Sequence, residues 1–299
     1  MNNTKAPFSS NCTSNGSVTQ WNTTCDLNGT GYRPALITFY SIVLVGGTIG
    51  AIVITWKIKN YRKSVTSTAM VNLIFIHVIF LVTVPFRISY YGLGEWKFGL
   101  IFCKLVDATI HAHMYLSFVF YVIIVVIRMI SFFNEKKTVQ FYQPWHASAV
   151  SLVIWFLVLM GVFSSFQSNY DNSTQNNTTR CFLVHNNPYK AHNKIQNYLC
   201  VIVVLGVFGV LLVIQTGVLI KLTIQHQGTL RKQHQFGAQM KTLFFVLIMI
   251  WFVPFLGFRI LYINQIKCCS SVLHVINEVF LALSALCCFD ALVLLVASH

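Results

Sequence analysis

Several ionisable side chains lie inside long apolar stretches of this sequence, where a charge needs a specific partner. Among them are Arg87, Asp107, His111, Arg128, Arg259 and Glu278. A guanidinium group forms two parallel hydrogen bonds with a carboxylate or a phosphate, so Arg87 and Arg259 could hold an anionic group. The alternative is that both arginines pair with Asp107 and Glu278 within the protein. The choice depends on the elements that carry these residues.

The composition places these stretches in a membrane. Hydrophobic residues make up 56% of the chain and charged residues only 9%, whereas a soluble domain has about 25% charged residues. The formal net charge of +14 comes from basic residues scattered between apolar spans. No basic stripe or nucleic-acid-binding motif accompanies that charge, so we exclude nucleic acid as a partner.

The apolar stretches are long enough to be membrane-spanning helices. A helix needs about 20 predominantly apolar residues to cross a bilayer. Seven stretches qualify, at about residues 35–56, 67–91, 103–133, 147–166, 197–222, 242–266 and 272–297. They predict an all-α membrane protein, with a seven-transmembrane helix bundle over residues 34–299. No secretory signal sequence precedes residue 34, so we expect the first span to act as an uncleaved signal anchor.

Glycosylation motifs indicate the orientation of the chain. N-x-[ST] sequons are modified only on the lumenal side. They occur at Asn2, Asn11, Asn15, Asn22 and Asn28 before the first span, and at Asn172, Asn176 and Asn177 between the fourth and fifth spans. Four spans separate the clusters, so both lie on one face. We expect residues 1–33 to form an extracellular glycosylated tail and the C-terminus to be cytoplasmic. Basic residues are divided too evenly between the two sides to decide.

The cysteines fall into two groups under this topology. Cys103, at the outer end of the third span, and Cys181, in the glycosylated loop, face the oxidising side, and we expect them to form a disulfide. The pairing of the other outer cysteines stays open; these are Cys12, Cys25, Cys268 and Cys269. Within the spans, Cys200, Cys287 and Cys288 are expected to be small apolar packing residues.

Several short segments, taken together, resemble a known family. They are "WKFGLIFC" (96–103), Arg128 at 25 residues after Cys103, Trp155, "IWFVPF" (250–255) and "CCFDALVLL" (287–295). In kind and order they resemble the rhodopsin-like G-protein-coupled receptors, along the whole chain. The resemblance implies a multi-pass receptor of the plasma membrane that is not an enzyme and needs no cofactor. Its expected partners are an extracellular small molecule, membrane lipids and a cytoplasmic heterotrimeric G protein.

The resemblance also implies which residues carry activation. Arg128 would contact the G protein. Trp251, Phe252 and Pro254 would form the switch of the sixth span, where the proline removes a backbone hydrogen bond and kinks the helix. His77 stands where the family has its sodium-binding aspartate. We therefore hypothesise that His77 pairs with Asp290 without an ion; a buried neutral histidine is the alternative.

The inner end of the bundle departs from the family. Ile127 replaces the acid that usually precedes the arginine, and residues 237–242 of the sixth span contain no carboxylate. Arg128 therefore lacks the acidic partners that hold it in the family's resting state. We predict high basal activity.

The outer end suggests a ligand pocket. The resemblance would direct Arg87, Asp107, His111, Arg259 and Glu278 toward a central cavity, with Tyr115 one turn below His111. Residues 252–259, F-x-P-F-x-x-x-R, resemble receptors for nucleotides and lipids, which suggests an anionic ligand of either kind. The alternatives are that the arginines reach outer headgroups or pair with the two acids. His113 is two residues from His111 and points elsewhere, so we expect no metal site.

A second class of function is a transporter or ion-conducting protein, because charges within the spans could mark an ion path. The absence of an internal repeat counts against it. An intramembrane enzyme is a distant third, since the sequence has no HExxH, GxSxG or P-loop motif.

Overall fold

The computed structural model describes residues 32–59, 65–133, 144–170, 181, 191–224, 230–252 and 270–289. Within them the chain forms seven α-helices and no strand. The helices are α1 (Tyr32–Lys59), α2 (Val65–Leu93), α3 (Leu100–Phe133), α5 (Pro144–Tyr170), α6 (Ala191–Ile224), α7 (Leu230–Ile248) and α9 (Ser270–Ser284). Two of them continue as 3-10 turns, α7 into η1 (Met249–Phe252) and α9 into η2 (Ala285–Phe289).

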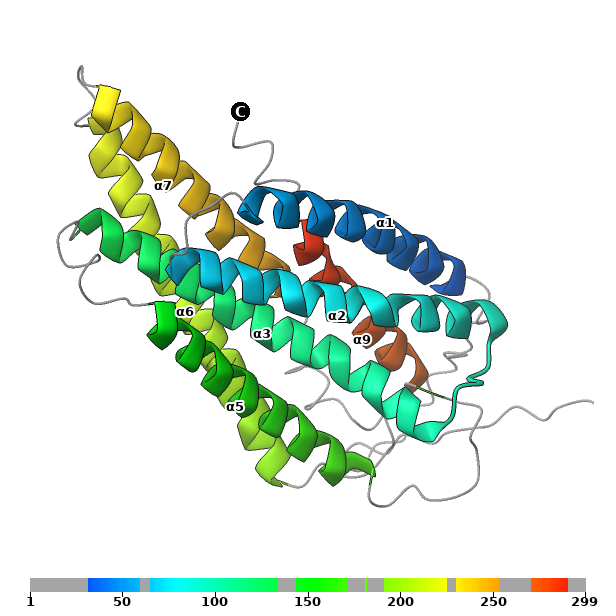
Figure 1. The fold of residues 1–299 in the computed structure, drawn as a ribbon. Helices are drawn as coiled ribbons and strands as arrows, with labels where there is room; N and C mark the ends of the chain where they lie inside the picture. The colour runs from blue at the N-terminus through cyan, green and yellow to red at the C-terminus, as the bar shows by residue number, and fades with distance from the viewer. Residues whose placement is uncertain are drawn as a thin grey trace, which may run out of the picture.

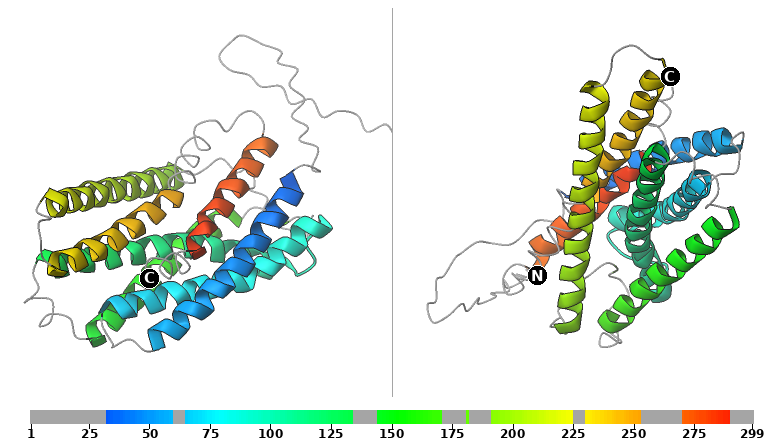
Figure 2. Two further views of the ribbon diagram at one scale, coloured as in Figure 1. Left: turned by 90° about the horizontal axis from the view of Figure 1, so that it is seen from above. Right: turned by 90° about the vertical axis from the view of Figure 1, so that its left-hand side faces the viewer.

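The helices form one bundle around α3 (Figure 1). α1 packs along α2, α2 along α3, and α5 against both α2 and α3. α6 pairs with α7, whereas α9 and η2 contact α1 (Figure 2). In the most apolar 18-residue stretch of each helix, 50% of the residues of α3 are buried, compared with 28% for α1 and 22% for α6. α3 is therefore the helix from which side chains reach most of the others.

Four of the described helices are long and apolar enough to cross a membrane: Tyr32–Trp56, Thr66–Leu93, Leu100–Phe133 and Tyr198–Ile224. Three shorter apolar segments overlap the predicted fourth, sixth and seventh spans; they are His146–Val162, Phe236–Ile248 and Glu278–Phe289. Large apolar side chains point outward from the bundle, including Ile52, Val82, Leu152 and Val213. A surface of this kind suits lipid contact rather than water.

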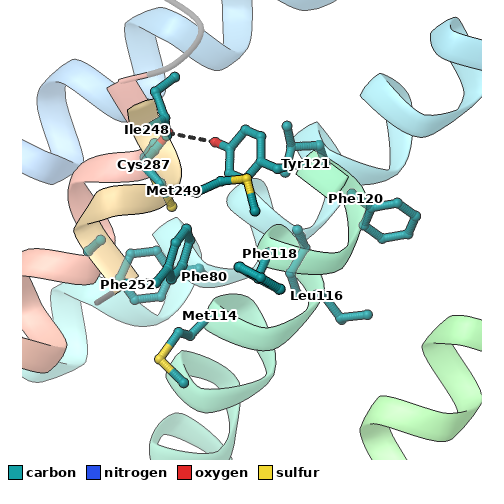
Figure 3. Packing of buried hydrophobic residues seen from close by; sticks show 14 of the residues in the cluster. Phe80, Met114, Leu116, Phe118, Phe120, Tyr121, Ile248, Met249, Phe252 and Cys287 are labelled. Atoms are coloured by element: carbon teal, nitrogen blue, oxygen red, sulfur yellow. Dashed lines mark hydrogen bonds between the residues drawn. The ribbon is translucent and has the colours of Figure 1, made fainter. Parts of the chain in front are cut away.

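Aromatic side chains fill the centre of the bundle (Figure 3). Phe252 of η1 is 1% exposed and packs edge-on against Phe118 of α3, with ring centroids 6.1 Å apart. The Tyr121 hydroxyl donates a hydrogen bond to the Cys287 backbone oxygen at 3.2 Å. α3 thereby contacts the 3-10 turns of both the sixth and the seventh spans.

Polar residues tie neighbouring helices together where apolar packing alone would let them slide. The Trp155 indole Nε1 of α5 donates to Asn72 Oδ1 of α2 at 3.0 Å, and Asn72 Nδ2 donates to Ser151 Oγ at 3.2 Å. Between α6 and α7, the Gln215 side-chain amide donates to the Gln239 side-chain oxygen at 3.0 Å. Each link pairs polar groups that lipid cannot satisfy.

α1 can approach η2 closely because it has glycines at the contact. A side chain at Gly46 would collide with the Phe289 ring. At Gly47, a Cβ atom would lie 2.9 Å from a Leu81 methyl carbon and 3.3 Å from Cys288 Cβ. The glycines therefore let η2 sit deep between α1 and α2.

The N-terminal end of α3 is closed by a disulfide between Cys103 and Cys181, as expected, with Cα atoms 5.8 Å apart. Both cysteines are buried together with Trp96 and Val106. The Trp96 indole donates to the Gly99 backbone oxygen at 2.7 Å. Gly99 has φ of 82°, a left-handed conformation that favours glycine. This geometry explains the spacing of the W-x-F-G segment.

Candidate functional site

A buried ionic network lies between α2, α3 and α9. Arg87 of α2 is fully buried. Its Nη1 lies 3.3 Å from Glu278 Oε2 of α9, and its Nη2 lies 3.3 Å from Asp107 Oδ1 of α3. One cation and two carboxylates give the three side chains a formal charge of −1. The pairing that the sequence left as an alternative for Arg87 is therefore present, with both acids at once.

Two tyrosines extend this network toward α1. The Tyr91 hydroxyl donates to Glu278 Oε2 at 2.6 Å. The Tyr91 ring stacks on Tyr40 of α1 with an interplanar angle of 9° and centroids 6.1 Å apart. Because a buried charge is tolerated only when it is paired and hydrogen-bonded, these contacts explain how an arginine can sit inside an apolar bundle.

His111 and Tyr115 follow Asp107 on the same face of α3, at spacings of one and two helical turns. The His111 Nδ1 atom lies 2.9 Å from the Asp107 backbone oxygen. Since a carbonyl only accepts, Nδ1 carries the proton of that hydrogen bond. Both side chains are half-buried. The structure thus joins Arg87, Asp107 and Glu278 directly and places His111 and Tyr115 along the same helix face.

Near the C-terminal end of α3, Arg128 is half-buried and contacts an aromatic ring. Its guanidinium carbon lies 4.9 Å from the centroid of the Phe245 ring of α7. A cation over an aromatic face gains about 0.5–2 kcal/mol, depending on its desolvation. Tyr121 lies beside Phe245, with ring centroids 6.1 Å apart. Arg128 is therefore connected to the same aromatic cluster as Phe252.

The sixth span changes its helical form just before its proline. α7 is α-helical to Ile248 and then tightens into the 3-10 turn η1. A 3-10 stretch within a helix often marks a hinge. Phe252, a predicted switch residue, is in this turn and contacts Phe118 and Tyr121. Pro254 lies outside the described residues, and so does the side chain of Trp251.

A family profile described as 7 transmembrane receptor (rhodopsin family) matches residues 47–293. The chain belongs to this family. As a rhodopsin-family receptor it is a multi-pass membrane protein that signals through G proteins, and it is not an enzyme. The transporter alternative is correspondingly set aside.

Three relatives illustrate the range of similarity. Human Probable G-protein coupled receptor 141 is 40% identical over 93% of this chain and 92% of its own length. Human Cysteinyl leukotriene receptor 1 is 26% identical over 85% of this chain and 79% of its own length. Probable G-protein coupled receptor 34 from Pan troglodytes is 24% identical over 91% and 74%.

One polar cluster of this receptor was missed by sequence reasoning. His77 Nδ1 lies 3.2 Å from His113 Nε2. Cys288 Sγ lies 3.5 Å and Cys287 Sγ 3.8 Å from the same His113 nitrogen. The cysteines are buried, as expected of packing residues, but they also contact the imidazole. The sequence does contain a pattern that could have indicated this cluster: two adjacent cysteines in one span, and a histidine near the middle of each of two other spans.

Several predicted residues fall outside the part of the chain that the structure describes. They are Asn2, Asn11, Asn15, Asn22, Asn28, Asn172, Asn176, Asn177, Cys12, Cys25, Cys268, Cys269, Arg259 and Asp290. The proposed His77–Asp290 pair and the part of Arg259 in ligand binding therefore stay predictions.

Proposed function

We propose that this receptor binds a small anionic molecule at the Arg87 network and passes that event to a G protein through Arg128. The observation that carries the proposal is the unequal burial of the two acids on Arg87. The Asp107 side chain is 17% exposed, whereas that of Glu278 is 5% exposed. Asp107 is the partner that a ligand can replace with less disruption.

Ligand binding would exchange one carboxylate for another anion. A ligand carboxylate or phosphate takes the position of Asp107 on the Arg87 guanidinium, which prefers a planar two-oxygen partner. The displaced Asp107 carboxylate turns toward solvent, since its side chain is already 17% exposed. Because Arg87 also contacts Glu278 of α9, the exchange alters the restraint between α2, α3 and the seventh span. Cysteinyl leukotriene receptor 1, a relative at 26% identity, is named for a leukotriene ligand.

An agonist screen with anionic lipids and nucleotides tests this proposal, with G-protein activation by the full-length receptor as the signal. The Asp107→Asn variant removes the competing charge, so the potency of an anionic agonist should rise about tenfold, or about 1.4 kcal/mol. Arg87→Lys keeps the charge but loses the planar fork, so potency should fall. Unchanged potency in both variants would refute the anionic-ligand proposal.

We also propose the orientation with residues 1–33 outside the cell and the C-terminus in the cytoplasm, at the plasma membrane. The Cys103–Cys181 disulfide supports it, since disulfides persist on the oxidising side. Antibody access to an N-terminal tag on intact cells, together with loss of mass on enzymatic removal of N-glycans, tests this topology. A tag accessible only after permeabilisation would contradict it.

At the inner end we propose weak restraint and therefore high basal activity. Ile127 stands where the family has an acid before the arginine, residues 237–242 contain no carboxylate, and the Arg128 guanidinium lies over the Phe245 ring. A cation–π contact of this kind supplies only about 0.5–2 kcal/mol, less than the acidic partners of the family's resting state would. The restraint on Arg128 is therefore small, and thermal fluctuation populates the G-protein-binding conformation without ligand.

A further inference from the structure

We propose that the centre of the bundle holds a Zn²⁺ site, independent of the proposed ligand pocket. Its four ligands come from three elements: α2, α3 and the 3-10 turn η2. They are His77, His113, Cys287 and Cys288. The donor atoms all lie within 4.8 Å of one another, and all four residues are buried.

The spacing of the donor atoms matches tetrahedral zinc. Zn–N distances near 2.0–2.1 Å and Zn–S distances near 2.3 Å place neighbouring ligand atoms about 3.3–3.8 Å apart around a tetrahedral ion. The His113 Nε2 atom lies 3.2 Å from His77 Nδ1, 3.5 Å from Cys288 Sγ and 3.8 Å from Cys287 Sγ. These three distances match those between ligands of a tetrahedral ion, and all four donor atoms lie within 4.8 Å of one another.

The local structure explains why two consecutive cysteines can share one ion. α9 changes into a 3-10 turn at Ala285, and this tighter winding carries both sulfur atoms to the same histidine nitrogen. Gly47 of α1 leaves room for the turn, since a Cβ atom there would press on Cys288. On the other side, the Phe80 ring stacks on His113 with centroids 4.4 Å apart. The donors are therefore enclosed by packed side chains.

The donor set favours zinc over the ions that prefer oxygen. Thiolate and imidazole are zinc ligands, whereas Mg²⁺ and Ca²⁺ select carboxylate and carbonyl oxygen. Zinc binding displaces one proton from each thiol, and two thiolates with two neutral histidines balance the charge of Zn²⁺. The completed site buries no net charge. Four protein ligands also leave no open coordination position, which is the arrangement of a structural site.

A bound ion would add a further link between α2, α3 and η2, below the Arg87 network that joins α2, α3 and α9. The ion would stabilise the conformation in which α2, α3 and η2 are aligned as they are here, and it would bias the receptor toward that conformation. Tyr121 of α3 donates a hydrogen bond to the Cys287 backbone oxygen and packs against Phe252. The proposed zinc site is therefore linked to the aromatic cluster at the centre of the bundle.

Metal analysis of the full-length receptor, purified in detergent without added metal, tests the site directly. We expect about one zinc ion per receptor, as for a closed structural site. Cys288→Ser and His77→Ala should lose most of that zinc. Two matched controls, Cys200→Ser in α6 and His146→Ala at the exposed start of α5, should retain it. Copper in place of zinc, or equal zinc in the site variants and the controls, would overturn the assignment.

A second measurement needs no variant and so does not depend on the variants folding. Unmodified receptor is treated with a chelator and then titrated with Zn²⁺ alone. We expect Tm to rise by roughly 5 °C at a hundredfold excess over Kd. X-ray absorption of the zinc-loaded protein should give two sulfur and two nitrogen ligands. No change in Tm, or a shell of oxygen ligands, would refute the site.

Discussion

Arg87 and Arg128 both lie in apolar helices, but the protein holds them in different ways. Arg87 is fully buried between two carboxylates and is linked through Glu278 to the Tyr91 hydroxyl. Arg128 is half-buried and lies over the Phe245 ring. Ion pairs within a low-dielectric bundle resist separation, whereas one cation–π contact is readily exchanged for another partner.

The difference teaches how the two ends of the bundle divide their tasks. The outer arginine joins α2, α3 and α9, so any ligand that replaces one of its partners changes a strong restraint. Arg128 lies over the Phe245 ring of α7, and in our proposal small changes in the sixth span are enough to release it. In the proposed mechanism, ligand binding alters a strong ionic restraint at Arg87, whereas G-protein coupling requires only the release of a weaker contact at Arg128.

The largest expected effect comes from removing the outer cation. Arg87→Met leaves two carboxylates buried without a counter-charge, which costs about 3–5 kcal/mol. Thermal unfolding of the purified receptor should show a large fall in Tm. The matched control is Lys97→Met, which removes the exposed Lys97–Glu95 ion pair and should cost at most about 1 kcal/mol. Equal losses in both variants would erase the distinction between a buried network and a surface pair.

A second test gives Arg128 a carboxylate partner, like those that Arg87 already has. Phe245→Glu places a carboxylate where the ring now faces Arg128, and a charge-assisted hydrogen bond is worth about 1.5–3 kcal/mol. Basal G-protein activation should fall about tenfold. Phe245→Gln is the control because it is polar and similar in size but carries no charge. An equal fall in both variants would show that loss of the ring, not the new charge, causes the change.

A smaller effect of opposite sign is expected at the same position. Phe245→Leu keeps an apolar side chain but removes the cation–π contact, which releases about 0.5–1 kcal/mol of restraint. Basal activation should rise roughly two- to fivefold. Phe244→Leu, at an exposed neighbouring position, should leave it unchanged. If basal activation stays constant in Phe245→Leu, the ring does not restrain Arg128.

The fold followed from the sequence because hydropathy and length determine which segments cross a membrane. Each predicted span overlaps a helix among the described residues, and the Cys103–Cys181 disulfide was expected because both cysteines were placed on the oxidising side of the membrane. The helix ends were less predictable. α7 begins at Leu230, well before the predicted span, because its polar first turns continue the helix beyond the apolar segment. Hydropathy detects the lipid-facing part and not the whole helix.

The sequence predicted contacts of the site only for charged residues, because a buried charge requires a partner of opposite charge. An arginine within an apolar bundle needs an acid, and Asp107 and Glu278 were named as alternatives to a ligand. The Arg128–Phe245 contact and the cluster of His77, His113 and two cysteines depend on how helices rotate against each other. Sequence spacing along one helix does not contain that information. The two-residue spacing of His111 and His113 on α3 argues against a metal ion bound by both histidines. It says nothing about a metal ion that His113 shares with residues of α2 and η2.

The central claim is that the inner arginine is weakly restrained and still couples to the G protein. Nucleotide exchange on a G protein, measured without ligand for the full-length receptor and for Arg128→Ala at equal surface expression, tests it most directly. We predict substantial exchange for the unmodified receptor and background exchange for the variant. Silent basal exchange by well-expressed receptor, rising only when an agonist is added, would contradict the account.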